Sequence, residues 1–210
     1  GAIDLRFDEW GVDLAVGCTY KYGNSGPGAP AWLYVRKSLQ TELGVPIQGW
    51  FANHDQFAMG PFFEPTDSIR RFQIASPSIM GLRAVETSYR MIGEAGMTAI
   101  SQKAAVGTEF MIDLFDAWLA PLGFTLITPR NHWQRGGHIT VAHPEAKKIA
   151  AAMRKFSNVI PDYRVPDSIR LAIAPLPTSY TEVWDGLDRM RALVESKRYL
   201  EIEDNGSRVT

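Results

Sequence analysis

Two short apolar segments near the start of the chain have the pattern of β-strands. Residues 12–17 read as a short buried strand, and residues 31–35 combine aromatic with β-branched side chains. Each is apolar on both faces, which is typical of a parallel sheet that helices cover on both sides. The surrounding sequence offers too few elements to cover them. We therefore expect residues 1–77 to be the remnant of a larger sheet domain, completed by a longer chain or by a second chain.

The segments between and after these strands have the composition of loops. Residues 21–30 contain three glycines and two prolines, which indicates a loop with special backbone angles. A strand rather than a helix follows this loop, so it lacks the helix N-terminus of a usual phosphate-binding loop. Residues 44–77 show no long period and carry several aromatic side chains. Such a long connection indicates a functional or interface loop.

From residue 78 onward, helical and strand patterns alternate. Periodicity predicts a linking helix within residues 78–96 and a second helix over residues 97–119. The other predicted elements are strands at 124–128, 138–142 and 168–174 and helices at 144–156 and 181–198. These elements indicate a small α/β or α+β domain over residues 97–202, followed by a frayed tail at residues 203–210.

Composition and charge narrow the class of protein. The chain has 210 residues, of which 45% are hydrophobic, and this share is typical of a globular protein. A net charge of −1 argues against a nucleic-acid or membrane-surface binder, and no apolar run approaches the ~18 residues that span a bilayer. The single Cys18 excludes a disulfide framework, and His138 and His143 fall on opposite faces of the strand pattern, so no metal site is expected. With no secretory leader pattern, we expect a cytoplasmic protein.

Lys21 and Arg170 are the first candidates for chemistry. Lys21 follows a strand, lies between two tyrosines and could be desolvated, which would make its amine a nucleophile; alternatively it is a solvated lysine that ends an edge strand. Strand alternation places Arg170 on one face with two alanines, which leaves room for a carboxylate that its planar fork can bind. The alternative is a polar sheet face that meets water.

Two further candidates lie in the long loop. The segment at residues 49–54 (GWFANH) gathers aromatic and short polar side chains that could hold an anion or a partner, or could be tucked into the core. Ser76 precedes a proline near a helix start, where its hydroxyl could face a ligand or act as an ordinary cap.

Several of these segments together resemble kynureninase, a pyridoxal 5'-phosphate (PLP) enzyme family of the aspartate aminotransferase fold (fold type I, similar to class V aminotransferases). Residues 13–22 (DLAVGCTYKY) and 24–31 (NSGPGAPA) resemble the segment with the cofactor lysine. The supporting motifs are GWF at 49–51, FAM at 57–59, RF at 71–72, SP at 76–77, RGGH at 135–138 and IR at 169–170. The resemblance implies an α/β fold: part of the large parallel-sheet PLP domain at residues 1–77, and a small C-terminal domain.

The resemblance also implies an activity and roles for single residues. The family hydrolyses L-kynurenine, or 3-hydroxykynurenine, to anthranilate, or its hydroxy form, and L-alanine, in tryptophan catabolism and NAD biosynthesis. Lys21 would bind PLP covalently and shuttle protons, and Tyr20 would contact the cofactor phosphate. Trp50 and Ser76 would reach the cofactor or substrate region, across a homodimer interface. Arg170 would hold the α-carboxylate of the amino-acid substrate.

Two departures from the family pattern bear on activity. Where the family has Gly-His after Trp-Phe, this chain has Ala52-Asn53-His54, so either Asn53 or His54 would contact the aromatic end of the substrate. The Asp-x-x-His segment that precedes Gly1 in the family is absent, so we expect this chain to need a missing N-terminal segment for activity. The alternatives are a non-catalytic fragment or dimerising subunit, and a related fold type I lyase or desulfurase acting on another amino acid.

Overall fold

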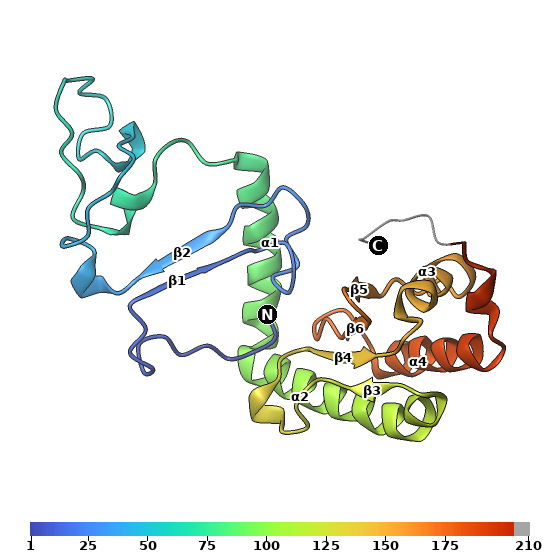
Figure 1. Ribbon diagram of the computed structural model, residues 1–210. Coiled ribbons are helices and arrows are strands. Elements are labelled where there is room, and N and C mark those ends of the chain that lie inside the picture. Colours follow the sequence, from blue (N-terminus) through green and yellow to red (C-terminus); the bar gives the residue numbers. More distant parts are fainter. Residues whose placement is uncertain (204–210) are drawn as a thin grey trace. The chain divides into compact units, whose positions relative to one another are not determined.

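The computed structural model describes residues 1–203 and divides the chain into two compact units (Figure 1). The N-terminal unit contains Leu5–Glu94. The C-terminal unit contains Gly1–Asp4 and the chain from Ala95 onward. The predicted tail lies outside the described residues apart from residue 203.

The N-terminal unit holds a two-stranded antiparallel sheet. Strands β1 (Leu14–Gly17) and β2 (Trp32–Val35) pair so that Leu14 lies opposite Val35. The side chains of Leu14 and Val16 are 54% and 78% exposed, so the prediction of a buried strand at residues 12–17 is wrong in this structure. Nothing in the described part of the chain covers these apolar side chains, although their type is that of strands buried on both faces.

Helix α1 (Ile79–Ala95) packs against the glycine-rich loop of its own unit. A Cβ added to Gly81 would lie 2.9 Å from Cδ of Pro30, so the helix can approach the loop only because this residue has no side chain. The hydroxyls of Ser88 on the helix and Ser25 in the loop are 2.8 Å apart, and both residues are buried. The helix therefore supports the loop that follows Lys21.

The rest of the N-terminal unit is loop with short turns of 3₁₀-helix. These turns span Lys37–Leu39, Trp50–Ala52 and Ile69–Phe72. They confirm that residues 44–77 form no long regular element. The periodic helix expected from residue 78 is confirmed, beginning at Ile79.

The C-terminal unit is an antiparallel sheet packed with three helices. The strands follow the order β3-β4-β6-β5, and each pairs antiparallel with its neighbours. Their bounds are β3 (Thr125–Leu126), β4 (His138–Ala142), β5 (Asp162–Arg164) and β6 (Ser168–Ala172), and the helices are α2 (Met97–Leu114), α3 (Ala146–Phe156) and α4 (Tyr180–Glu195). Figure 1 shows α2 lying alongside β4. This is the α+β form of the expected small domain.

The core of this unit follows the alternation of the two central strands. Ile139 and Val141 of β4 and Ile169 and Leu171 of β6 are buried in one cluster with residues of all three helices. The intervening positions on these strands, Arg170 among them, are partly or fully exposed. One face of the sheet is therefore the core face, and the other is a polar face.

Most expected elements of the C-terminal unit are present, with shifted ends. The helix expected over residues 97–119 is α-helical to Leu114 and continues as a π-helical turn over Phe115–Leu119. Strand β6 ends at Ala172, two residues earlier than expected, and Pro175 follows soon after. Strand β5 was not expected, because its three residues are mostly polar and it forms only by pairing with β6.

Candidate functional site

Lys21 lies on a turn whose base is tied down by hydrogen bonds. Thr19 is buried, and its hydroxyl donates to the carbonyl of Pro30 over 2.7 Å. The amide of Ser25 donates to the carbonyl of Thr19, and the amide of Asn24 donates to that of Lys21. A Cβ added to Gly23 would lie 2.4 Å from the Thr19 carbonyl oxygen, so this turn requires glycine. The turn holds the backbone of Lys21 in one place.

The side chain of Lys21 is exposed within this unit. Its Nζ lies 5.5 Å from the centre of the Tyr20 ring, and Tyr20 is itself about half exposed. The desolvated surroundings considered for Lys21 are therefore not formed by the described residues of its unit. The amine remains accessible to a ligand.

The aromatic loop forms a pocket of about 360 Å³. Trp50 meets Phe51 edge to face at 4.7 Å between ring centres, and Phe57 at 5.9 Å. The pocket is lined by Gln48, Gly49, Trp50, Asn53, Gln56, Met59, Gly60, Pro61, Phe62 and Phe63. Trp50 is 41% exposed, so the cluster is only partly tucked in. It presents aromatic faces with a few polar groups.

Asn53 and His54 have different surroundings. The Asn53 side chain closes the loop: its Nδ2 donates to the carbonyl of Asp55 over 2.8 Å, and its Oδ1 accepts from the amide of Glu64 over 2.7 Å. The backbone amide of His54 donates to the carbonyl of Glu64, and the residue is exposed. Both ends of the Asn53 amide are therefore occupied by backbone groups, which favours His54 as the group that meets a ligand.

Ser76 is exposed in the loop that leads to α1. The hydroxyl that accepts a hydrogen bond at the start of the helix belongs to Ser78, from the amide of Gly81 over 3.2 Å. That contact is the one an N-cap makes.

Arg170 lies on the polar face of β6 and pairs with a carboxylate of its own sheet. Its register partner on β5 is Asp162, and its Nη2 donates to Oδ2 of that residue. The same oxygen accepts from Arg164, over 3.0 Å from Nε and 2.7 Å from Nη2. The position predicted to bind a carboxylate therefore already has one nearby, supplied by the unexpected strand.

His138 lies on the same polar face of the sheet. It pairs in register with Ala172, two positions along β6 from Arg170. Burial lowers the pKa of His138, and the positive charge of Arg170 lowers it further. Near neutral pH this histidine is therefore kept uncharged beside the arginine.

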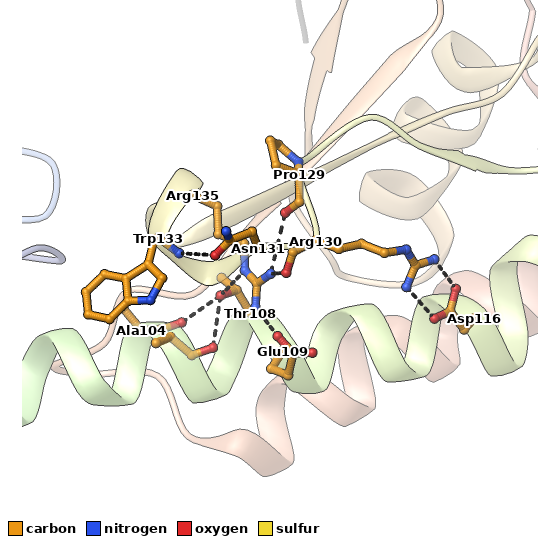
Figure 2. Close-up of polar contacts among 10 residues, drawn as sticks. Ala104, Thr108, Glu109, Asp116, Pro129, Arg130, Asn131, Trp133 and Arg135 are labelled. Carbon is orange, nitrogen blue, oxygen red and sulfur yellow. Dashed lines mark hydrogen bonds and ion pairs between the residues drawn. The ribbon is translucent and has the colours of Figure 1, made fainter.

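Arg135 was not singled out from the sequence, and it is the most extensively bonded side chain of the C-terminal unit in Figure 2. Its side chain is 1% exposed. Nε donates to the Thr108 hydroxyl over 3.0 Å, Nη1 to the carbonyls of Pro129 and Arg130, and Nη2 pairs with Glu109. These bonds join α2 to the loop that leads into β4. In the sequence, its signal is an arginine beside two glycines, within the RGGH motif at 135–138.

The candidate residues divide between the two units. Lys21, Tyr20, Trp50, Asn53, His54 and Ser76 lie in the N-terminal unit, and Arg170 lies in the C-terminal unit. Among the described residues, no group of three or more histidine, cysteine, aspartate or glutamate side chains could hold a metal ion. No helix in the described part of the chain is long and apolar enough to cross a bilayer.

Comparison with known sequences finds similarity to kynureninases. Residues 100–190 match the model of the kynureninase C-terminal domain. Kynureninase of Pseudomonas fluorescens is 34% identical over 97% of this chain, and that of Geobacillus thermodenitrificans is 39% identical over 95%. The matches cover 49% and 46% of those two proteins, so the chain spans about half the length of these relatives.

Solved structures of PLP enzymes have the same fold as this chain over about half of their length. The apo cysteine desulfurase of Thermococcus onnurineus matches 92% of this chain with a TM-score of 0.73 and 18% identity, over half of its own length. The C-DES mutant with glycine covalently linked to its PLP cofactor matches 90% with a TM-score of 0.69 and 15% identity. Both matches are confined to about half of a PLP-enzyme fold. Residues 100–190 are thus similar to the kynureninase C-terminal domain, and the chain as a whole is similar to about half of a kynureninase.

Proposed function

We propose that this chain is the lysine-bearing C-terminal half of a PLP-dependent kynureninase, which hydrolyses L-kynurenine or its 3-hydroxy form to the anthranilate and L-alanine. The observation that carries the proposal is 34–39% identity to kynureninases along 95–97% of the chain. The rigid turn under Lys21 and the accessible guanidinium of Arg170 support it. On this proposal the remaining half of the fold lies on residues that this chain does not contain.

The side chains of the N-terminal unit fit the chemistry of PLP in part. An exposed primary amine stands on a fixed turn at Lys21, and a phenol hydroxyl lies next to it at Tyr20. The exposed hydroxyl of Ser76 and the indole N–H of Trp50 are further donors that a phosphate can use. We assign the carboxylate that pairs with the pyridinium nitrogen to the other half of the fold.

Each residue then has a distinct role. Bound PLP would supply an electron sink for bond cleavage at the substrate side chain. Lys21 would hold the cofactor through Nζ and would move a proton with the same atom. Tyr20 would bind the phosphate, and Trp50, Ser76 and His54 would orient the cofactor and the aromatic end of the substrate. Arg170 would bind the α-carboxylate through charge-assisted hydrogen bonds.

Labelling of the full-length holoenzyme tests the assignment of Lys21. The protein should show a visible absorbance band that borohydride removes, and mass spectrometry should then find the cofactor on the peptide of Lys21. Lys21→Ala should abolish both the label and anthranilate formation, whereas Lys37→Ala, at an exposed lysine of the same unit, should change neither. A label on another lysine would contradict the proposal.

A homodimer in the cytoplasm is also part of the proposal, and a non-catalytic dimerising subunit is its alternative. Exposed apolar side chains favour a partner for the N-terminal unit; they include Val16 at 78% and Phe62 at 80% exposure. A desulfurase role is disfavoured, because a desulfurase needs a reactive cysteine on a mobile loop of its C-terminal half, whereas the single cysteine of this chain, Cys18, directly follows strand β1. Sedimentation of the full-length protein, with and without PLP, measures the dimer. A full-length protein without activity would favour the alternative of a non-catalytic dimerising subunit.

A further inference from the structure

The neighbour of Arg170 on the adjacent strand has a position suited to hold it. Asp162 and Arg170 are register partners on β5 and β6, so their side chains leave the same face of the sheet side by side. One carboxylate oxygen of Asp162, Oδ2, accepts from Arg170 and from both Nε and Nη2 of Arg164. A single acidic group therefore bridges two guanidinium groups.

This contact leaves part of the Arg170 guanidinium available. It uses Nη2 alone, and among the described residues no hydrogen bond to Nε or Nη1 of Arg170 is present. A guanidinium has five N–H donors and binds a carboxylate through two of its nitrogens on one edge. The side chain is 38% exposed, so a ligand can reach it. Asp162 can fix one edge of the fork while the other edge stays open.

The charges around Arg170 leave a net positive site. Arg164 offsets the charge of Asp162, so the three side chains together carry one positive charge. His138 adds none near neutral pH, because burial and Arg170 lower its pKa. Glu182 lines the same hollow as Arg170, but its carboxylate accepts from the amide and the hydroxyl of Ser179 in the capping box of α4. Both acidic groups near Arg170 therefore already accept hydrogen bonds, Asp162 from Arg164 and Glu182 from Ser179.

We propose that Asp162 is a positioning residue for carboxylate recognition. It holds Nη2 of Arg170 so that the free edge of the fork meets the α-carboxylate of the substrate, and Arg164 prevents it from neutralising the site. This inference rests on the proposed function of Arg170. The opposite arrangement, in which Asp162 competes with the substrate for Arg170, predicts the opposite sign for the effect of removing Asp162.

Steady-state kinetics of the full-length holoenzyme with L-kynurenine separates these arrangements. Asp162→Ala should raise KM by about 3–10-fold with kcat little changed, which corresponds to the loss of one oriented hydrogen bond. Asp162→Asn keeps an oxygen acceptor and should recover part of the loss. The inhibition constant of the amine that lacks the α-carboxylate of kynurenine should not change in either variant. Asp113→Ala, at an exposed aspartate of α2, is the matched control and should leave KM unchanged.

The variants distinguish failure of the inference from failure of the proposed function. If Arg170→Ala leaves KM unchanged, Arg170 does not bind the carboxylate, and both its proposed role and the role of Asp162 are wrong. If Arg170→Ala raises KM but Asp162→Ala leaves it unchanged or lowers it, Asp162 does not position the arginine. An equal loss of affinity for the amine without the carboxylate would mean a general structural defect, and would also overturn the inference. Thermal unfolding of each variant checks that the kinetics come from folded protein.

Discussion

Replacing Arg135 tests whether the C-terminal unit depends on the buried bonds that join α2 to the loop before β4. In Arg135→Met the aliphatic stem is retained, but the guanidinium is lost. Thr108 then loses one partner, although its hydroxyl still donates to the carbonyl of Ala104 over 2.9 Å. The carbonyls of Pro129 and Arg130 lose a donor as well. The perturbation therefore removes bonds to four groups, the Thr108 hydroxyl, the two carbonyls and the Glu109 carboxylate, and leaves the backbone otherwise intact.

The expected loss follows from the quality of each bond. The contact with the Pro129 carbonyl is long at 3.4 Å, and Glu109 is more than half exposed, so that ion pair contributes little. The bonds to Thr108 and to the Arg130 carbonyl come from a charged donor whose side chain is 1% exposed. Together they give an expected loss of about 2–4 kcal/mol in the free energy of unfolding. The stability of Arg135→Lys should fall between that of the wild type and that of Arg135→Met, because an ammonium keeps the charge but cannot reach all four groups.

Urea unfolding and amide hydrogen exchange measure this effect. In Arg135→Met, the amides of residues 130–137 should exchange faster, in addition to the loss of global stability. The matched control is Arg130→Met in the same loop, whose bidentate pair with Asp116 at 2.7 Å is exposed and should matter much less. Figure 2 shows both arginines. Equal effects of the two substitutions, or no effect of Arg135→Met, would refute this reasoning.

Three further predictions concern other parts of the chain. Arg71 is 8% exposed, and its Nε has no hydrogen-bond partner among the described residues. A buried polar group without a partner is destabilising, so Arg71→Met should raise the urea midpoint of the 210-residue chain. A lower midpoint would show that the guanidinium is paired. Burial lowers the pKa of His138 and His143, so the unfolded chain binds more protons just below about pH 6.5, and stability should fall as the pH drops through that range. The double variant with glutamine at both positions should show a flatter dependence of the urea midpoint on pH, and an unchanged slope would contradict the assignment. Gly23→Ala should weaken PLP uptake by full-length protein, measured by absorbance titration, because the added Cβ would lie 2.4 Å from the Thr19 carbonyl oxygen. The control is Gly44→Ala, where a Cβ has open space and φ lies outside the left-handed region, and which should leave uptake unchanged. Equal uptake by wild type and Gly23→Ala would rule the clash out.

Local periodicity was enough to predict where several elements begin and end. Helix α1 and strand β4 were predicted almost to the residue, because their apolar positions recur with the period of the element and are bounded by proline, glycine or polar residues. Strand β4 buries its apolar positions, whereas Ile79 and Leu82 of α1 stay exposed. The alternation of β6 also placed Arg170 on the face away from the core, and the structure confirms this. The specific lysine segment indicated a resemblance to kynureninases, which the comparisons confirm.

Which side chains meet depends on contacts between distant segments, and these are visible only in the folded chain. Asp162 reaches Arg170 because β5 pairs with β6 in one register, and a polar three-residue strand has no periodic signal of its own. Arg135 reaches Thr108, which is 27 residues away along the chain, because the loop before β4 packs on α2. The exposed apolar faces of β1 and β2 are a further case: side-chain type records the burial that a strand favours, but burial itself depends on what covers the strand. Periodicity is a local property of the chain, whereas ion pairs, register and covering surfaces arise from contacts between segments far apart in sequence.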